Sequence, residues 1–269
     1  MIAEAKDFAA ECDALHALLS PLSDADFERT TQFKDWTIND VMAHLHSGDV
    51  NAAMTLLDPP GFEAAKAHRL AARDVGESML AYQRNAIGNL EGQALLASWR
   101  ASAAETSDAY AKAEPKQRVK WAGPDMSARS SITARLMETW AHAQAIYDVL
   151  GVERQDGDRI RAIAHLGAIT FNWTFANRGE KPPGPPPHIR LTAPSGDIWE
   201  WNADQAPPGE RIEGSAVAFA QVAAQTRNFA DVDLTATGPT ANAWMTKAQC
   251  FAGPPNDPPP PGARFKQAG

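Results

Sequence analysis

The segment from Met126 to Gly151, MSARSSITARLMETWAHAQAIYDVLG, most constrains what this chain can fold into. It predicts one helix of about six turns, because a Ser-rich start precedes an apolar stripe and a glycine follows where a left-handed cap is favoured. Within this segment, Glu138 and His142 stand four residues apart. Residues at that spacing share a helix face, so the carboxylate and the imidazole can bind one ion together. The pair is half of a potential metal site.

The surroundings of Glu138 leave two interpretations open. Arg135, Glu138 and His142 lie on a face beside the apolar stripe, and both faces can be buried if the helix lies inside a bundle. A carboxylate turned inward must be paired with a cation or hydrogen-bonded. Judged from the sequence of this helix alone, Glu138 could pair equally well with Arg135, one turn earlier, or with a metal ion.

A second half-site is predicted far upstream, in WTINDVMAHLHSGD. Thr37 followed by Asp40 is typical of a capping box, and Pro59 and Pro60 supply a stop, so a helix is expected between them. His44 shares a face with apolar residues, whereas His46 is rotated by about 200° from it and lies with Met42 and Val50. Taken alone, His44 is equally a core histidine that donates to a carbonyl.

Length and composition limit the partners that the chain can have. Its 269 residues fit one large domain or two ordinary ones, and no apolar run approaches the roughly 20 residues of a membrane span. The N-terminus lacks the pattern of a signal peptide, so we expect a cytoplasmic protein. A net charge of −8 without a Lys/Arg-dense segment argues against nucleic acid and membrane surfaces. A small-molecule substrate is favoured, for a monomer or a homodimer.

Two cysteines, Cys12 and Cys250, are too few and too far apart to indicate a disulfide framework or a paired-cysteine metal site. The remaining sequence predicts a division into a helical part and a mixed part. We place a metal-binding helical bundle at 1–180, a small α+β domain at 181–252, after the Pro-rich GEKPPGPPP linker, and a disordered Pro-rich tail at 253–269. The fold class is therefore mainly α. Further helices are expected at 2–19, 63–87, 92–113 and 156–178.

Four segments together resemble a known family: WTINDVMAHL, WAGPDMSARSSITARLMETWAHAQAIYDVLG, RLTAPSGDIWEWN and IEGSAVAFA. The chain is similar to the mycothiol-dependent maleylpyruvate isomerase-like metal-binding family, in a branch distinct from the maleylpyruvate isomerases themselves. The resemblance implies a DinB-like four-helix bundle with extra helices, followed by a small C-terminal α+β domain. It also implies a divalent metal, usually zinc, held by His44, Glu138 and His142, which would be both metal ligands and catalytic residues.

The same resemblance implies a metal-dependent isomerase or S-transferase that uses a low-molecular-weight thiol, mycothiol or glutathione. Two His and one carboxylate with open positions form the ligand set of a catalytic zinc site. We predict Trp121, Arg135 and Arg227 as substrate-binding residues. Asp49 and Asp148 are candidates for orienting the ligating imidazoles.

The alternative function is a non-catalytic, metal-stabilised protein that binds a small hydrophobic acid. Several tryptophans near the predicted site could line an apolar pocket for such a ligand: Trp36, Trp99, Trp121 and Trp140.

Overall fold

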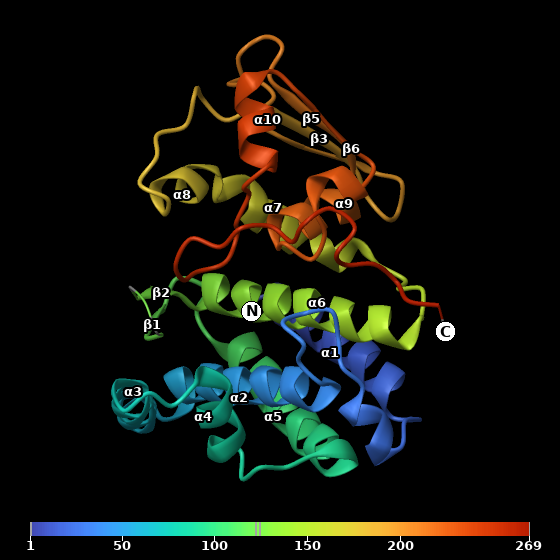
Figure 1. The fold of residues 1–269 in the computed structure, drawn as a ribbon. Helices are drawn as coiled ribbons and strands as arrows, with labels where there is room; N and C mark the ends of the chain where they lie inside the picture. Colours follow the sequence, from blue (N-terminus) through green and yellow to red (C-terminus); the bar gives the residue numbers. More distant parts are fainter. Residues whose placement is uncertain (1, 122, 124, 269) are drawn as a thin grey trace. The chain divides into compact units, whose positions relative to one another are not determined.

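The computed structural model describes residues 2–121, 123 and 125–268. The chain forms two compact units, Met1–Val149 and Leu150–Gly269, and each is described by itself (Figure 1). The first unit is a helical bundle and the second combines helices with a small sheet. The predicted fold class, mainly α with a four-helix bundle followed by a small α+β part, is confirmed.

The first unit is built around four long helices, α1, α2, α5 and α6. α2 packs against α5, and α1 packs against α5 as well. Large aromatic side chains fill the centre, among them the fully buried Phe8, Trp99, Tyr110 and Trp140. Its elements are α1 (Glu4–Leu19), η1 (Asp24–Glu28), α2 (Ile38–Leu57), α3 (Pro59–Asp74), α4 (Met79–Ala86), α5 (Gly92–Lys112), the antiparallel pair β1 (Arg118–Val119) and β2 (Met126–Ser127), and α6 (Ala128–Leu150).

The two helices that carry the predicted ligands begin and end where the sequence signals place them. At the start of α2, the Thr37 hydroxyl accepts from the Asp40 amide at 3.1 Å and the Asp40 carboxylate accepts from the Thr37 amide at 3.0 Å. This reciprocal capping box satisfies two amides that the first helical turn leaves without partners. At the end of α6, Gly151 has a φ of 70°, the left-handed conformation that glycine adopts without strain.

The segment predicted as one helix over 63–87 is two helices with a sharp turn between them. Gly76, with a φ of 86°, ends the path of α3, and Ser78 then caps α4 by accepting from the Ala81 amide at 3.1 Å. The chain reverses because glycine tolerates this backbone conformation and serine offers a new helix start. α4 is thereby turned back to pack against α2.

The second unit contains a four-stranded sheet in the order β4-β3-β5-β6. β3 and β5 are parallel, whereas the other two neighbouring pairs are antiparallel. α9 packs against α7. The elements are η2 (Asp158–Ile160), α7 (Arg161–Ile169), α8 (Phe171–Ala176), β3 (His188–Thr192), β4 (Ile198–Trp201), β5 (Arg211–Ser215), α9 (Ala216–Ala223), η3 (Phe229–Asp231), β6 (Leu234–Thr237) and α10 (Pro239–Met245).

The boundary predicted at residue 181 differs from the division between the compact units. The helical segment at 156–178 is broken near Thr170 into α7 and α8, and both belong to the second unit. Phe171 lies edge-on to Trp244 of α10, with ring centroids 5.0 Å apart, and Gly167 lets Phe219 of α9 approach closely. The apolar stripe of this segment therefore belongs to the core of the second unit and not to the bundle.

The Pro-rich C-terminal segment, which the sequence predicts to be disordered, forms hydrogen bonds and an ion pair with the rest of the second unit among the described residues. The Asn256 side chain donates to Gln225 Oε1 at 2.6 Å, and Arg178 forms an ion pair with Asp257 at 2.8 Å. The Gly262 amide donates to Asp231 Oδ2 at 2.8 Å. Side chains of the folded unit supply the partners that proline-rich backbone cannot find within regular structure.

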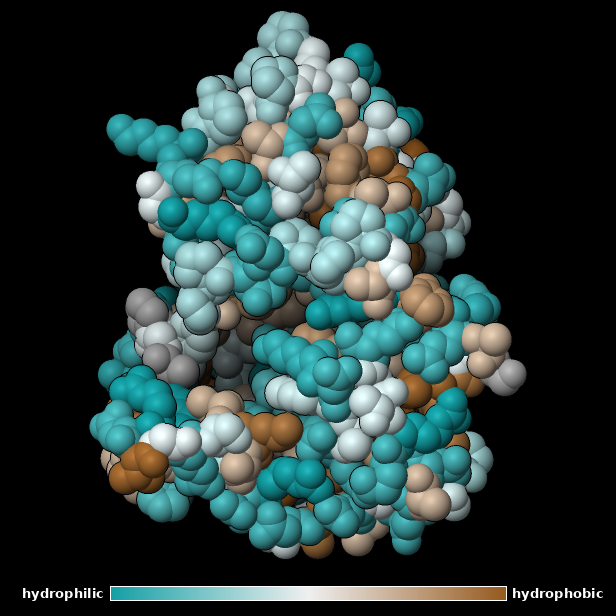
Figure 2. Space-filling view, viewed as in Figure 1, coloured by the Kyte–Doolittle hydropathy of each residue, from teal (hydrophilic) through white to brown (hydrophobic). Residues whose placement is uncertain are grey.

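None of the helices among the described residues is both long and apolar enough to cross a membrane. The face drawn in Figure 2 is mainly hydrophilic, with apolar groups between the polar ones. Val75, in the turn between α3 and α4, is 84% exposed, and single exposed apolar side chains of this kind are common on protein surfaces.

Candidate metal centre

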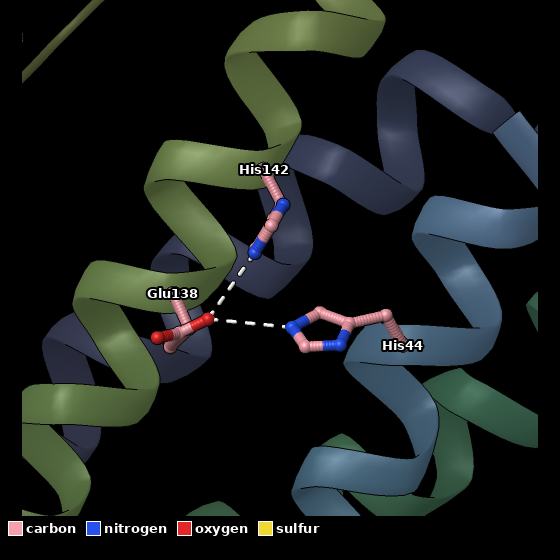
Figure 3. A group of neighbouring side chains, drawn as sticks. All are labelled: His44, Glu138 and His142. Carbon is pink, nitrogen blue, oxygen red and sulfur yellow. Dashed lines mark hydrogen bonds and ion pairs between the residues drawn. The ribbon is translucent and has the colours of Figure 1, made fainter. Parts of the chain in front are cut away.

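Three side chains from two helices converge on one point of the first unit (Figure 3). His44 extends from α2, and Glu138 and His142 extend from successive turns of α6. Glu138 Oε2 lies 3.3 Å from His44 Nε2 and 3.2 Å from His142 Nε2. One potential ligand atom from each residue lies within 4.8 Å of the others, in the one such group found among the described residues. The two half-sites predicted from the sequence thus meet.

The group is partly open to solvent. The side chain of Glu138 is 28% exposed, that of His44 22% and that of His142 13%. Fully buried ligands would enclose an ion completely, whereas this exposure leaves room for a further small molecule to reach it. Partial exposure is therefore compatible with the open coordination position of a catalytic site.

The electrostatics of the group favour the protonation states that bind a metal ion. Burial opposes ionisation of Glu138, but hydrogen bonds from His142 and His44 hold its pKa well below the usual range. Burial, together with the neighbouring His44, lowers the pKa of His142 to about 4 although Glu138 opposes that shift. At neutral pH the carboxylate is therefore ionised and the His142 ring is neutral, as ligands must be.

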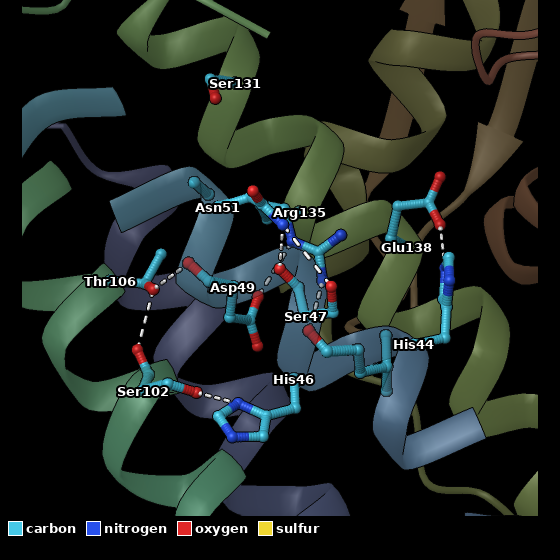
Figure 4. A network of polar contacts seen from close by, with 12 residues as sticks. His44, His46, Ser47, Asp49, Asn51, Ser102, Thr106, Ser131, Arg135 and Glu138 are labelled. Atoms are coloured by element: carbon cyan, nitrogen blue, oxygen red, sulfur yellow. Dashed lines mark hydrogen bonds and ion pairs between the residues drawn. The ribbon is translucent and has the colours of Figure 1, made fainter. Parts of the chain in front are cut away.

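Arg135, the alternative partner of Glu138, is bound elsewhere (Figure 4). Its Nε donates to Asp49 Oδ1 at 2.9 Å and its Nη2 donates to the Leu45 carbonyl at 3.2 Å. The other oxygen of Asp49 accepts from Trp99 Nε1 at 3.0 Å. Among the described residues, the ion pair of Arg135 is with Asp49, so the two histidines are left as the partners of Glu138.

Aromatic side chains from the loop before α2 cover one side of the histidines. The Phe33 ring meets the His142 ring edge-on at a centroid distance of 4.9 Å, and Trp36 stacks on His142 at 6.2 Å. Lys34 Nζ lies 5.2 Å from the Phe33 centroid and 5.8 Å from that of Trp36. Lys34 and Asp35 both have a positive φ, 55° and 57°, a strained turn that directs the lysine over the rings.

Sequence reasoning named Trp36 but missed Phe33 and Lys34. The available signal was the FKDW run directly before the helix cap, which places two aromatic residues and a cation at the N-terminal entrance of the ligand-bearing helix. Sequence reasoning also missed Gln83 of α4, whose Oε1 lies 3.3 Å from His44 Nδ1. No local signal identifies Gln83, because its approach depends on the turn between α3 and α4.

The other predicted residues have contacts of their own. Asp148 accepts from Gln144 at 3.0 Å, and Asp49 is bound to Arg135. Trp121 is partly buried in the loop between β1 and β2, where residues 122 and 124 are outside the described chain. Arg227 follows α9 in the second unit and donates to the Thr226 carbonyl at 3.0 Å. Substrate binding by Trp121, Arg135 and Arg227 stays a prediction.

Residues 8–147 match the family described as the mycothiol maleylpyruvate isomerase N-terminal domain, a span that includes all three residues of the candidate centre. Uncharacterized proteins from two strains of Mycobacterium tuberculosis are 37% identical over 253 residues, covering 93% of this chain and 95% of theirs. The crystal structure of the mycothiol-dependent maleylpyruvate isomerase superposes with a TM-score of 0.56 at 19% identity, over 88% of this chain and 94% of that one. A mutant of that isomerase gives a TM-score of 0.54. These two structures establish similarity of fold.

Proposed function

This chain belongs to the mycothiol maleylpyruvate isomerase family, and we propose that it is a metal-dependent enzyme that uses a low-molecular-weight thiol to act on a small unsaturated acid. The observation that carries the proposal is the convergence of His44, Glu138 and His142 while Arg135 is bound to Asp49. A carboxylate that faces two imidazoles, while the nearby arginine of the described chain is bonded to another acid, is the arrangement expected of a metal site.

The donor set fits a divalent transition metal. Two imidazole nitrogens and one carboxylate oxygen are the ligands of many catalytic zinc sites, which keep a fourth position for water or substrate. A zinc ion bound there would polarise a substrate oxygen and lower the pKa of a thiol or of water. The chain's own contribution is to keep His142 neutral and Glu138 ionised, and to hold the three donors on two helices that are joined by the Asp49–Arg135 pair.

The surroundings favour an unsaturated acid as the substrate. Phe33 and Trp36 offer flat apolar rings beside His142, against which a conjugated carbon chain can pack. Lys34, exposed above the same rings, provides a positive charge for a carboxylate. The aromatic rings also keep water from one side of the site, which strengthens these charge interactions.

We propose isomerisation or S-transfer as the reaction. The sulfur of the thiol adds to one carbon of the activated double bond and its proton is delivered to the neighbouring carbon. Rotation about the resulting single bond, followed by loss of the same thiol and proton, yields the geometric isomer. If the adduct is released instead, the reaction is an S-transfer.

The experiment combines metal content with turnover. Protein purified without a metal-chelating tag is expected to hold about one transition-metal ion per chain, as the single three-residue site requires. Metal-loaded protein is then incubated with mycothiol or glutathione and a cis-unsaturated 2-oxo diacid, and the products are followed by NMR. The matched control is His68→Ala, which removes an exposed histidine of the same unit.

The outcomes separate the alternatives. Full metal content in both His44→Ala and His142→Ala would place the site elsewhere. Binding of the acids to metal-loaded protein without product, for every thiol tested, would instead support a non-catalytic protein that binds small ligands.

A further inference from the structure

Both ring nitrogens of His44 face acceptor atoms. Nε2 faces Glu138 Oε2 at 3.3 Å, and Nδ1 faces the amide oxygen of Gln83, also at 3.3 Å. With its oxygen toward the ring, the amide of Gln83 accepts a hydrogen bond from a protonated Nδ1. In the tautomer whose only proton is on Nδ1, the ring presents an Nε2 lone pair to the carboxylate of Glu138.

In that tautomer the two acceptors repel one another unless a cation lies between them, whereas a proton on Nε2 makes the contact a hydrogen bond to Glu138. His142 Nε2 approaches the same carboxylate oxygen at 3.2 Å, so the lone pair of His44 points at the place where the three donors converge. The tautomer that Gln83 imposes is therefore the one that a metal ligand needs. A ligating imidazole ordinarily donates its other N–H to an oxygen in this way.

Gln83 is held in position by its neighbours in the sequence. The Tyr82 hydroxyl donates to the Ala65 carbonyl of α3 at 3.1 Å. On the other side, Arg84 forms an ion pair at 2.8 Å with Asp40, a member of the capping box of α2. These contacts fix α4 against the helix that carries His44. Gln83 is buried, with 8% of the residue exposed, so water competes poorly for its amide.

We propose that Gln83 is a positioning residue that selects the Nδ1-protonated tautomer of His44 and thereby sets the affinity of the site for a divalent transition metal. The amide of Gln83 can also flip, so that its NH2 group donates to Nδ1 of His44. The Nε2–H of His44 then donates to Glu138. The first orientation suits the metal-bound site and the second suits the metal-free site. The amide orientation is thus linked to metal binding, and this inference rests on the metal site proposed above.

The test compares three variants in the intact protein. Gln83→Met keeps the length of the side chain but removes the acceptor, whereas Gln83→Glu keeps an acceptor and cannot donate. Gln93→Met is the matched control, because Gln93 is a half-buried glutamine of the same unit that donates to the Leu22 carbonyl at 2.7 Å. The zinc dissociation constant is measured by competition with a chromophoric chelator, and the tautomer of His44 by 15N NMR.

We expect Gln83→Met to bind zinc about 10- to 100-fold more weakly, the usual effect of losing a partner of a ligating histidine. Gln83→Glu should restore wild-type affinity or exceed it, and Gln93→Met should leave it unchanged. In the zinc-loaded wild type, the NMR signals of His44 should show a protonated Nδ1. In metal-free Gln83→Met, the preference for that tautomer should be lower than in metal-free Gln83→Glu.

Equal zinc affinity in the wild type, Gln83→Met and Gln83→Glu would overturn the role of Gln83 while leaving the metal site intact. A wild-type protein that binds no zinc would overturn the site and this inference together. Zinc binding that depends on Gln83 in a protein without thiol-dependent turnover would sustain the inference and contradict the proposed enzyme. If Gln83→Met does not fold, the comparison between Gln83→Glu and the wild type decides, since a lower affinity in Gln83→Glu contradicts the proposal.

Discussion

Asp49 on α2 and Glu138 on α6 are two inward-facing carboxylates of the same bundle, and they have different partners. Asp49 is fully buried, and the chain itself supplies its donors, the Arg135 guanidinium and the Trp99 indole. Glu138 is 28% exposed and faces two imidazoles. One negative charge is balanced permanently inside the protein, whereas the other is left available to a cation from solution. The balanced carboxylate joins the helices and the available one is suited to binding a metal.

The same contrast separates two histidines that are only two residues apart on α2. His46 is buried, and its two ring nitrogens each lie 2.9 Å from a serine hydroxyl, those of Ser98 and Ser102 on α5. Burial lowers the pKa of His46, so the ring is neutral and its hydrogen-bonding capacity is used within the chain. His44 instead faces Glu138 and Gln83. Rotation about the helix axis thus assigns one histidine to structure and the other to the site.

The largest effect on stability is expected from Asp49→Ala. Removing this carboxylate leaves the buried guanidinium of Arg135 without its ion-pair partner, which should cost about 3–5 kcal/mol in the free energy of unfolding. Urea denaturation of the metal-free protein measures the loss. A change below about 1 kcal/mol would mean that the pair contributes no more than an exposed one.

At Glu138, the second carboxylate of the comparison, the expected effect is a loss of metal binding in His142→Ala. Removing one of three ligands should weaken zinc binding by more than about 100-fold, beyond the usual effect of outer-shell substitutions. That factor corresponds to about 3 kcal/mol. Elemental analysis and chelator competition measure it, with His68→Ala as the control, and a variant that keeps one tightly bound ion would break the comparison between the two carboxylates.

The unfolding free energy of the metal-free protein should fall as the pH is lowered from about 6.5 to about 4. In this window the unfolded His142 takes up a proton and the folded one, with a pKa of about 4, does not, so acid favours unfolding. The difference of about 2.5 pKa units corresponds to at most about 3 kcal/mol. Urea titrations of the wild type and His142→Ala at both pH values isolate this contribution, and identical pH dependence in the two proteins would refute it.

A smaller effect is expected from Gly48→Ala. A Cβ atom at this position would lie 2.6–2.8 Å from the guanidinium atoms of Arg135, so the guanidinium must shift and its bond to Asp49 must weaken. Crowding of this kind costs about 1–3 kcal/mol, and the higher helix propensity of alanine offsets up to about 1 kcal/mol. A net loss of about 1 kcal/mol in urea denaturation is therefore expected, whereas a net gain would show that Arg135 can move freely.

An effect of similar size on stability, without any effect on zinc binding, should come from His46→Gln, which keeps hydrogen-bonding groups between the two serines. We expect a loss of about 1 kcal/mol in the free energy of unfolding, the scale of one hydrogen bond. Zinc affinity should equal that of the wild type. Weaker zinc binding in this variant would show that the two histidines of α2 are not independent.

Much of the candidate site could be predicted from local spacing. The capping box of Thr37 and Asp40 marked the start of α2. Within that helix, the two-residue interval places His44 and His46 on different faces. The four-residue interval from Glu138 to His142 placed both side chains on one face of α6. Because helix geometry is regular, these relations follow from position in the sequence once the helices are recognised. The joining of the two halves came from the resemblance to a family.

Other features could not be predicted, because they depend on which elements pack together. Local spacing suggested that Arg135 pairs with Glu138. In the structure the partner of Arg135 is Asp49, which lies on another helix and 86 residues away in sequence. The turn at Gly76 directs Gln83 toward His44, and the apolar stripe of α7 and α8 packs in the second unit. An apolar stripe shows that a helix must bury one face but not which partner covers it.

The sequence by itself determined the two helices that carry the site, the faces on which their polar residues lie, and the two halves of the group able to share an ion. Only the tertiary structure decided which charges balance one another. A carboxylate inside a bundle must find a cation or a hydrogen-bond donor, and the choice among candidates depends on distances between elements far apart in the chain. At those distances Arg135 forms its ion pair with Asp49, and Glu138 faces His44 and His142.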